Sequence, residues 1–416
     1  MGKPRSDVVI VGGGVMGLMA AYYLAGEGAE VTVLEKGRLP AGSSYGNAGL
    51  IVPSHLQPLC SPGNVKEGLR HLLNPTGPFS IHLSPDPGRW AWLVRFVRHS
   101  TAAHVKNAVG IYKELAERSL ALHDELARKA GSVYEYARDG LLCLYETPKA
   151  LEEAAKDAEE LTRAGRPARV LDEREVRNLV PAAGPSIIGG VLQEPDGRLH
   201  PAAFVSWLAD QVRRAGGRIL EETEVFGASF AGKAVRRLQT TKGPVEADQV
   251  VLAAGAWTGR VAAMLGRPLP VEAAKGFSIT YGRPSGAPSL PLLLEEARVA
   301  VTPFADSLRL AGVLELAGLD DRLSPARIRA MEQDLRRSLP GLGSLKLREI
   351  WRGFRPCTPD GLPFIGRLQR PQNVWVATGH ATKGIFLGPV TGELTARLLS
   401  GSPPDSALLK ALDPNR

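Results

Sequence analysis

Cysteine is scarce in this sequence, and long hydrophobic runs are missing. The 416 residues contain three cysteines, far apart and without a Cys-x-x-Cys spacing: Cys60, Cys143 and Cys357. This excludes a disulfide framework and the common zinc-binding patterns, so we expect no metal site and a reducing compartment such as the cytoplasm. No uninterrupted apolar stretch approaches the ~20 residues that span a bilayer. The chain passes from Met1–Ser6 directly into a strand-like run, so we also expect no signal peptide.

A recognisable nucleic-acid-binding module is also missing, although the chain is basic. The formal net charge is +8 and the isoelectric point is near 9.4. The basic residues are scattered and are not interleaved with exposed aromatic residues in any recognisable module. We therefore expect no nucleic-acid partner and attribute the positive charge to the attraction of anionic substrates toward a cleft. With 44% hydrophobic residues, a chain of this length is expected to form two interleaved domains.

The sequence does contain a dinucleotide-binding pattern near its start. A β-branched run, residues 8–11, leads directly into Gly12-x-Gly14-x-x-Gly17, and an apolar helix-like stretch follows. The three glycines permit, in order, a tight turn, a close approach of the backbone to a pyrophosphate, and packing of the helix against the sheet. A second strand, residues 31–34, ends at Glu35. Its carboxylate suits the ribose hydroxyls and disfavours NADP.

The remaining cofactor segments are spread along the chain, which favours FAD over NAD. A NAD dehydrogenase usually completes its doubly wound domain in one contiguous stretch. Here a loop of small and hydroxyl residues, Gly42–Gly49, comes next, and such a loop can wrap a second phosphate and a flat ring. Further buried-strand patterns appear only at residues 247–257 and 373–380. We therefore expect one cofactor-binding domain assembled from separated segments.

Five motifs in the same order make the chain resemble the FAD-dependent D-amino-acid oxidase superfamily over nearly its whole length. They are the N-terminal glycines with Glu35, the Ser43–Gly49 loop, Lys275-Gly276-Phe277, Arg355-Pro356-Cys357-Thr358-Pro359-Asp360-Gly361 and Gly379-His380-Ala381-Thr382-Lys383-Gly384. Asn47-Ala48-Gly49 and residues 275–280 resemble the D-amino acid dehydrogenase branch of this superfamily. The last two motifs are similar also to those of glycine oxidase and sarcosine oxidase.

The resemblance implies an α/β (α+β) fold, in which an FAD-binding, Rossmann-like doubly wound domain is interleaved with a substrate domain on a mostly antiparallel sheet. We expect the FAD-binding domain at residues 1–80, 165–265 and 350–416, and the substrate-binding domain, with a helical insertion, at 81–164 and 266–349. The sequence pattern predicts helices near 90–97, 102–129 and 148–164, and a strand over 141–145. It also predicts β-rich runs in 179–192 and 275–310, and a helix over 325–339 that Ser324 caps.

The resemblance also implies which residues bind FAD, with the backbone of Val225 at the adenine. They are Gly12, Gly14, Val15, Met16, Gly17, Glu35, Lys36, Ser43, Ser44, Asn47, Ala48, Gly49, Leu50, Val225, Ala254, Gly255, Trp257, Gly384 and Ile385. The last two, with a helix opening near Pro389, are expected to stabilise negative charge on the flavin pyrimidine. Some sarcosine oxidases tether FAD through a cysteine. Alignment puts that position at Gly353 and not at Cys357, so we expect non-covalent FAD.

Two cations and a histidine are the candidates for the catalytic site. Arg355 matches the arginine that grips the substrate carboxylate in glycine oxidase, and a guanidinium presents two parallel donors for that task. Lys383 matches a carboxylate-binding lysine of sarcosine oxidase. His380 either orders its loop by a hydrogen bond or contacts the substrate. The expected walls of the substrate pocket are His55, Tyr45 and Tyr281.

The resemblance implies an enzyme that oxidises the Cα–N bond of a D-amino acid by hydride transfer to flavin N5. The resulting imine hydrolyses to a 2-oxo acid and ammonia. A glycine- or sarcosine-type oxidase acting on glycine or N-methyl amino acids is the alternative. A non-enzymatic subunit with structural FAD is a third interpretation, in which Arg355 and Lys383 have no purpose. The sequence leaves open the preferred amino acid, the oligomeric state and the electron acceptor, whether a quinone, another carrier or oxygen.

One segment leaves open a peripheral contact with the inner face of a membrane. Residues 90–98 combine aromatic residues with arginines at near-helical spacing. This is typical of a surface-binding helix or, as we favour, of an ordinary amphipathic helix with a core face. Met1-Gly2 with Ser6 also matches an N-myristoylation pattern, which we attribute to chance because a strand follows immediately.

Overall fold

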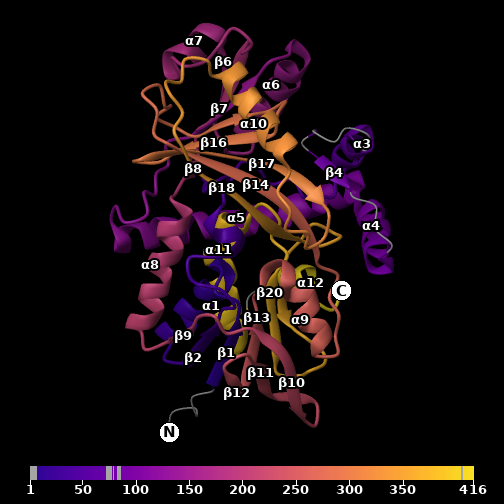
Figure 1. Ribbon diagram of the computed structural model, residues 1–416. Coiled ribbons are helices and arrows are strands. Elements are labelled where there is room, and N and C mark those ends of the chain that lie inside the picture. Colours follow the sequence, from indigo (N-terminus) through magenta and orange to yellow (C-terminus); the bar gives the residue numbers. More distant parts are fainter. Residues whose placement is uncertain (1–6, 72–76, 78, 82–85, 404–405) are drawn as a thin grey trace.

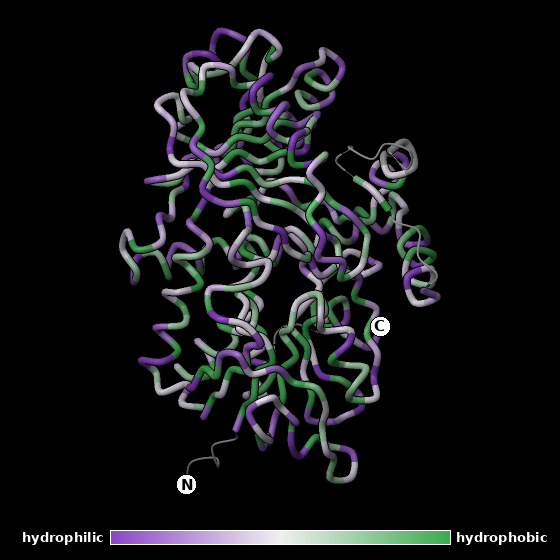
Figure 2. Tube along the Cα trace, in the orientation of Figure 1, coloured by the Kyte–Doolittle hydropathy of each residue, from purple (hydrophilic) through white to green (hydrophobic). Residues whose placement is uncertain are grey.

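Two β-sheet layers lie one above the other in a computed structural model of the chain, with helices between and around them (Figure 1). The structure describes residues 7–71, 77, 79–81, 86–403 and 406–416. The N-myristoylation pattern at Met1-Gly2 and Ser6 therefore lies outside the described residues. Figure 2 shows that hydrophobic residues concentrate along the strands of both layers. The mixture of parallel and antiparallel sheets with helices confirms the expected fold class.

The smaller layer is a six-stranded sheet in the order β19-β20-β13-β1-β2-β9. Its strands are β1 (Asp7–Val11), β2 (Glu30–Leu34), β9 (Arg218–Leu220), β13 (Gln249–Leu252), β19 (Phe364–Arg367) and β20 (Val374–Thr378). All neighbours pair in parallel except β19, which is antiparallel to β20. Segments from three distant parts of the chain thus build one sheet, as predicted from the separated strand patterns.

β1 shows why a strand of this sheet appears in the sequence as a continuous apolar run. Val8 and Ile10 belong to the core with α1 (Val15–Gly26) and α11 (Gly384–Leu399). Val9 and Val11 belong instead to the core on the opposite face. That face is covered by β10 (Val225–Ala231), β11 (Ala234–Thr240), β12 (Gly243–Glu246) and α9 (Thr258–Met264). Because both faces of β1 are covered, every position from Val8 to Val11 is apolar.

The larger layer is a nine-stranded sheet in the order β18-β14-β17-β16-β15-β5-β7-β6, with β4 also paired to β17. Its strands are β4 (Phe79–Ile81), β5 (Leu141–Tyr145), β6 (Ala168–Asp172), β7 (Gly189–Gln193), β14 (Glu272–Gly282), β15 (Leu292–Leu294), β16 (Val299–Pro303), β17 (Ser307–Leu316) and β18 (Leu347–Cys357). The sheet is mostly antiparallel, and only the β15–β5 and β17–β4 pairs are parallel. The core on one face of it includes residues of β14, β17 and α10 (Pro325–Ser338).

Two of the predicted domain boundaries do not follow the sheets. β6 and β7 fall in the predicted FAD-binding segment 165–265, but both join the nine-stranded sheet, where β7 pairs with β5. β18 crosses the boundary predicted at residue 350 and pairs with β14 at the edge of the same sheet. The reason is that strand pairing joins residues far apart in the chain, and the local pattern of a strand does not show its partners.

Most predicted helices are present, with boundaries shifted by a few residues: α4 (Pro87–His99), α5 (Ala102–Ala130), α6 (Pro148–Arg163) and α10. Ser324 stands before α10 as expected, but its side chain makes no capping hydrogen bond, and Pro325 at the first helical position marks the start. The β-rich run expected in 179–192 contains one strand, β7. A helix, α7 (Glu173–Leu179), precedes it, and its capping box of Asp172 and Glu175 was a missed signal.

The last long helix begins earlier than predicted. α11 starts at Gly384, so Pro389 lies inside the helix and not at its opening. Proline has no N–H, and the carbonyl of Ile385 therefore loses its usual helical donor. His123 of α5 lies at this point. Its Nε2 donates to the carbonyl of Phe386 at 2.9 Å, and it also interacts with the carbonyl of Ile385.

Shorter elements complete the described fold: α2 (Gly42–Tyr45), α3 (Pro62–His71), α8 (Pro201–Arg214), α12 (Ser406–Leu412), β3 (Leu50–Ile51), β8 (Gly197–Arg198) and a 3-10 helix, η1 (Gly255–Trp257). Among the described helices, none has both the length and the apolar character needed to cross a membrane.

Candidate active site

A cavity of about 1050 Å³ lies between the two layers. Its walls come from the β1–α1 turn, the end of β2, the 41–50 loop and the start of α11 on one side, and from β14, β17 and β18 on the other. This volume is at the upper end of the range for ligand sites, so it suits a large cofactor together with a small substrate. The sequence motifs singled out for cofactor and substrate therefore meet at one place.

The three glycines of the N-terminal turn have distinct positions. Gly12 has a φ of +113°, and a Cβ there would lie 2.4 Å from the carbonyl oxygen of Ala253. A Cβ on Gly17 would lie 1.9 Å from the carbonyl oxygen of Gly12, so Gly17 lets α1 pack against the turn. Gly14 is different, because its nearest neighbour is the Ser44 hydroxyl at 3.4 Å and it faces the cavity. Only there is the backbone open to an approaching phosphate.

Glu35 lies on the cavity wall at the end of β2. Its carboxylate accepts the N–H of Gly13 at 2.7 Å and the N–H of Gly37 at 2.8 Å. These bonds fix the side chain and leave further lone pairs for a ribose. The neighbouring Lys36 ammonium lies 3.4 Å from the centre of the Trp257 ring, and burial lowers its pKa.

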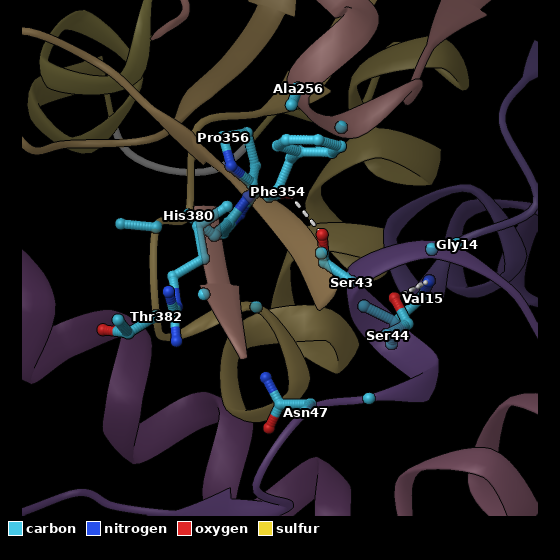
Figure 3. Close-up of a pocket in the computed structure, with 18 of the residues that line it drawn as sticks. Gly14, Val15, Ser43, Ser44, Asn47, Ala256, Phe354, Pro356, His380 and Thr382 are labelled. Carbon is cyan, nitrogen blue, oxygen red and sulfur yellow. Dashed lines mark hydrogen bonds between the residues drawn. The ribbon is translucent and has the colours of Figure 1, made fainter. Parts of the chain in front are cut away.

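The loop after β2 is held on both sides. Ser44 Oγ accepts the N–H of Val15 at 3.0 Å, and the Ser43 hydroxyl donates to the carbonyl of Phe354 (Figure 3). Asn47 also closes its own turn, because its Oδ1 accepts the N–H of Gly49 at 2.8 Å. The loop therefore connects the start of α1 to β18 of the larger sheet.

Two residues that sequence reasoning missed also shape this loop. Arg309 on β17 is 4% exposed, and its Nη1 donates to the carbonyls of Tyr45 at 3.0 Å and Asn47 at 3.1 Å. Trp351 on β18 lines the cavity, and its ring contacts Gly46 and Gly353, where any Cβ would lie about 2 Å from ring atoms. The two glycines were the available signal for Trp351. No signal pointed to Arg309.

Most of the predicted cofactor residues line the cavity. They are Gly12, Gly14, Val15, Met16, Glu35, Lys36, Ser43, Ser44, Asn47, Ala48, Leu50, Val225, Ala254, Gly255, Trp257, Gly384 and Ile385. Gly17 and Gly49 are not among the residues that line the cavity. Gly49 has a φ of +78°, and its Cβ would collide with the carbonyl oxygen of Leu199.

Arg355 projects into a space that Gly276 leaves open. The two residues lie on the paired strands β18 and β14, and a Cβ on Gly276 would lie 2.0 Å from Arg355 Nη1. The same Nη1 donates to the carbonyl of Val313 at 2.9 Å. Burial lowers the pKa of the guanidinium, and within the described chain no carboxylate lies within ion-pair distance of it. The glycine of the Lys275-Gly276-Phe277 motif thus leaves room for the side chain of Arg355, which belongs to a separate motif.

Lys383 lies on the cavity wall just before α11. Its ammonium donates to the carbonyl of Gln57 at 2.8 Å and lies 4.9 Å from the centre of the Tyr112 ring. Burial lowers its pKa to about 8.

His380 lines the cavity and is 1% exposed. Its Nε2 lies 2.8 Å from the Thr391 hydroxyl, which itself donates to the carbonyl of Leu387, so Nε2 carries the proton. Nδ1 therefore keeps a lone pair, and it has no partner in the described part of the chain. Burial lowers the pKa of His380 to about 3. The bond to Thr391 connects the loop at His380 to α11.

The expected pocket walls differ in their positions. His55 lies on the wall, and its Nε2 is 2.6 Å from Gln193 Oε1. Tyr281 lies within the core of the larger sheet, 2% exposed, and its hydroxyl donates to Glu332. The structure thus does not bring Tyr281 to the cavity, because alternate residues of β14 face opposite sides of the sheet and Tyr281 faces α10. The hydroxyl of Tyr45 donates to Glu349 at 2.9 Å.

The site fits a flavin dinucleotide. The open backbone at Gly14 suits a phosphate, Glu35 suits a ribose, and the buried lone pair on His380 Nδ1 needs a donor that a flavin amide or a ribityl hydroxyl can supply. No cysteine is among the described residues that line the cavity.

Comparisons with known proteins agree with this geometry. The sequence profile of the family described as "FAD dependent oxidoreductase" (DAO) matches residues 7–398. The chain is 34% identical over 406 residues to a D-amino acid dehydrogenase of Bradyrhizobium diazoefficiens, covering 96% of each. It is 31% identical to D-amino acid dehydrogenase 1 of Mesorhizobium japonicum, covering 96% of this chain and 97% of that one. A solved glycine oxidase from Bacillus cereus shares the fold, with a TM-score of 0.78, 22% identity and 98% coverage of both chains. The chain therefore belongs to the FAD-dependent oxidoreductase family.

Proposed function

We propose that this enzyme is an FAD-dependent D-amino acid dehydrogenase. It oxidises the Cα–N bond of a D-amino acid to an imine, which water hydrolyses to a 2-oxo acid and ammonia. The observation that carries the proposal is a partly buried arginine, Arg355, without a carboxylate partner in the described chain, in the same cavity as the dinucleotide turn. The relatives above 30% identity carry the same activity in their names.

The chain's own groups bind and orient the substrate. The guanidinium of Arg355 takes the substrate carboxylate through two parallel donors, which fixes the position of Cα. The bound FAD supplies a hydride acceptor. Backbone N–H groups in the first turn of α11, from Gly384, would stabilise the negative charge that a bound FAD gains on reduction. The walls from both layers shield these interactions from water.

The glycine- and sarcosine-type alternative has weaker support. The glycine oxidase from Bacillus cereus is 22% identical, and a likeness at that level shows the fold alone. Both reactions need the carboxylate clamp, so the clamp does not separate them.

The products separate the two reactions. We expect D-amino acids to bleach the flavin under anaerobic conditions and to yield a 2-oxo acid and ammonia. Formaldehyde from sarcosine, with no bleaching by D-amino acids, would contradict the proposal. Reoxidation of the bleached enzyme by air and by a soluble quinone, compared as rates, identifies the electron acceptor.

We also propose that α4 contacts an anionic membrane surface. Trp92 and Phe96 face the core, whereas Trp90, Val94 and Val97 form an exposed apolar stripe, 47–56% exposed. Arg95 and Arg98 are also exposed on α4, and no acidic residue occurs between Pro87 and His99. Such a helix binds headgroups with its basic residues and the acyl boundary with its apolar residues.

Flotation with vesicles tests this contact. We expect the protein to float with phosphatidylglycerol vesicles and not with phosphatidylcholine vesicles. Val94→Glu should abolish flotation without changing the rate of D-amino acid oxidation with a soluble electron acceptor. Equal behaviour of the variant and the native protein would contradict a role for α4.

A further inference from the structure

We propose that Lys383 and His55 form a second anion-binding group in the cavity, and that the preferred substrates are D-amino acids with an acidic side chain, the D-glutamate and D-aspartate class. The inference rests on the proposed function and on Arg355 as the partner of the α-carboxylate. It names the substrate class that the same site selects.

Lys383 is the first part of the argument, because its charge lacks a counterion. Its ammonium contacts the carbonyl of Gln57 at 2.8 Å and the ring of Tyr112. No carboxylate lies within 4 Å of it in the described chain. A partly buried ammonium is costly without a partner, and the lowered pKa of Lys383 reflects that cost. A bound anion would supply the missing charge.

The α-carboxylate that pairs with Arg355 is not the anion that Lys383 lacks. Its guanidinium is fixed in the space beside Gly276 and bonded to the carbonyl of Val313. Two parallel donors of a guanidinium satisfy both oxygens of one carboxylate. The α-carboxylate is then fully paired, and Lys383 remains available for a second anionic group on the substrate.

His55 belongs to the same part of the cavity. His55, Lys383 and Arg298 all line the cavity, and Lys383 bonds the carbonyl of Gln57, two residues along the chain from His55. Burial, with a smaller effect of the positive charges of Lys383 and Arg298, lowers the pKa of His55 to about 4. Arg298 is paired with Glu295 at 3.2 Å. Behind the ring, Gln193 Oε1 is 2.6 Å and Asp196 Oδ2 is 3.9 Å from Nε2. An anion bound in the cavity beside His55 favours the imidazolium.

The acidic residues of the cavity lie elsewhere. Among the described wall residues, the acids are Glu35, Glu224 and Asp321. Glu35 bonds the dinucleotide turn, Glu224 precedes Val225 at the expected adenine end, and Asp321 pairs with Arg352 at 3.3 Å. On the substrate side, Arg355 and Lys383 are therefore cations without a carboxylate partner in the described chain, which favours an acidic side chain and disfavours a basic one.

The decisive experiment compares substrates of nearly equal size with the native holoenzyme. Initial rates with D-glutamate, D-glutamine, D-aspartate, D-asparagine, D-alanine and D-lysine give kcat/KM for each. We expect D-glutamate to exceed D-glutamine, and D-aspartate to exceed D-asparagine, by at least about tenfold, as one charge-assisted contact provides. Equal values for each acid and its amide would overturn the inference and leave the proposed function intact.

Variants then locate the second group. Lys383→Met should reduce the ratio of D-glutamate to D-glutamine by about tenfold, and Lys383→Arg should retain part of the ratio. Lys113→Met removes one exposed positive charge that does not line the cavity and serves as the control, for which the ratio should not change. A ratio that survives in Lys383→Met would overturn the role of Lys383.

A binding measurement with the native holoenzyme does not depend on any variant. Perturbation of the flavin spectrum by glutarate and by glutaramate gives their dissociation constants, and we expect glutarate to bind at least about tenfold more tightly. Equal binding would contradict a second anion group. If no D-amino acid bleaches the flavin at all, the proposed function fails and this inference fails with it.

Discussion

At the residue scale, Arg355 is the side chain on which the proposed chemistry depends most. Its guanidinium lies in the cavity, its charge has no carboxylate partner in the described chain, and its position requires that residue 276 has no side chain. A point charge cannot reproduce the two parallel donors that position Cα. The charge and the geometry of the residue therefore make separate contributions.

Substitutions can separate these contributions. Arg355→Lys should impair turnover as well as binding, and Arg355→Ala should lower kcat/KM for a D-amino acid by at least about thirty-fold, because a charge-assisted pair of this kind is worth ~2–5 kcal/mol. Gly276→Ala keeps the arginine but displaces its guanidinium, so we expect kcat/KM for a D-amino acid to fall while the FAD content stays normal. Gly227→Ala is the control, since a Cβ there meets nothing closer than 3.8 Å. If Arg355→Ala hardly changed kcat/KM and Lys383→Ala lowered it severely, Lys383 and not Arg355 would be the partner of the α-carboxylate.

Glu35 is the second residue with a separable role. Glu35→Ala removes the ribose acceptor and the two bonds to Gly13 and Gly37, and leaves the phosphate-binding backbone in place. The variant should still fold. We expect the affinity for FAD to fall by about tenfold or more, because a charged hydrogen bond contributes ~1.5–3 kcal/mol. Titration of the apoenzyme with FAD by fluorescence measures it. Glu30→Gln at the exposed start of β2 should leave the affinity unchanged, and an unaltered affinity in Glu35→Ala would exclude the ribose contact.

At the scale of elements, the junction of α5 with α11 determines where the start of α11 stands. Pro389 removes one N–H from α11, and Ser119 and His123 of α5 donate to the carbonyl of Phe386 at 2.6 Å and 2.9 Å. On the other side, α11 approaches α1 closely, because a Cβ on Gly392 would lie 2.5 Å from the backbone of Met19. The first turn of α11 is thereby fixed against the cavity.

His123 should make the stability of this junction depend on pH. Burial lowers its pKa from 6.5 to about 4 in the folded protein, so between these values the unfolded chain binds one more proton than the folded chain. The free energy of unfolding therefore falls as the pH falls below 6.5, by about 1.4 kcal/mol per pH unit for one such group. His123→Gln keeps a donor for the Phe386 carbonyl and removes the titration. Urea unfolding at pH 7, 6 and 5, with saturating FAD, should show a smaller pH dependence in the variant; equal slopes would refute the assignment.

At the scale of the whole molecule, the cavity exists because the two sheets hold one loop between them. Ser44 bonds this loop to the start of α1 in the smaller layer, and Arg309 of β17 bonds it to the larger layer. FAD retention should therefore depend on a residue that does not line the cavity. Arg309→Met should weaken FAD binding by about tenfold or more through the loss of two charged hydrogen bonds. Arg169→Met, at an exposed position on β6, is the control. Equal FAD content of the two variants after gel filtration would show that the bonds from Arg309 to the loop are unimportant for FAD retention.

The attachment of the cofactor also belongs to this scale. No cysteine is among the described residues of the cavity wall, and Cys357 is buried, with its carbonyl accepting from Trp92 Nε1 at 3.1 Å. Acid or heat denaturation should release all of the FAD into the supernatant, where its absorbance is measured. Flavin that stays on the denatured polypeptide would contradict non-covalent binding.

The sequence by itself determined what depends on neighbours along the chain. The turn at Gly12 needs a positive φ, β1 appears as four consecutive apolar residues, and α5 ends at a glycine. These signals involve residues next to one another in the chain, so the cofactor turn, the long helices and the order of the motifs follow from the amino-acid sequence alone. The arginine of the substrate end was identified in the same way, through a resemblance that rests on short motifs.

The tertiary structure alone decided what depends on distant residues. The sheet to which β6, β7 and β18 belong, the space that Gly276 leaves for Arg355, the clamp by Arg309 and the absence of a carboxylate near Lys383 in the described chain all follow from pairing across long separations in sequence. Tyr281 shows the same limit, since its type suits a pocket wall but the face of β14 on which it stands directs it into the core. A strand shows which of its residues share a face, but only its partners in the folded chain determine which face meets the cavity.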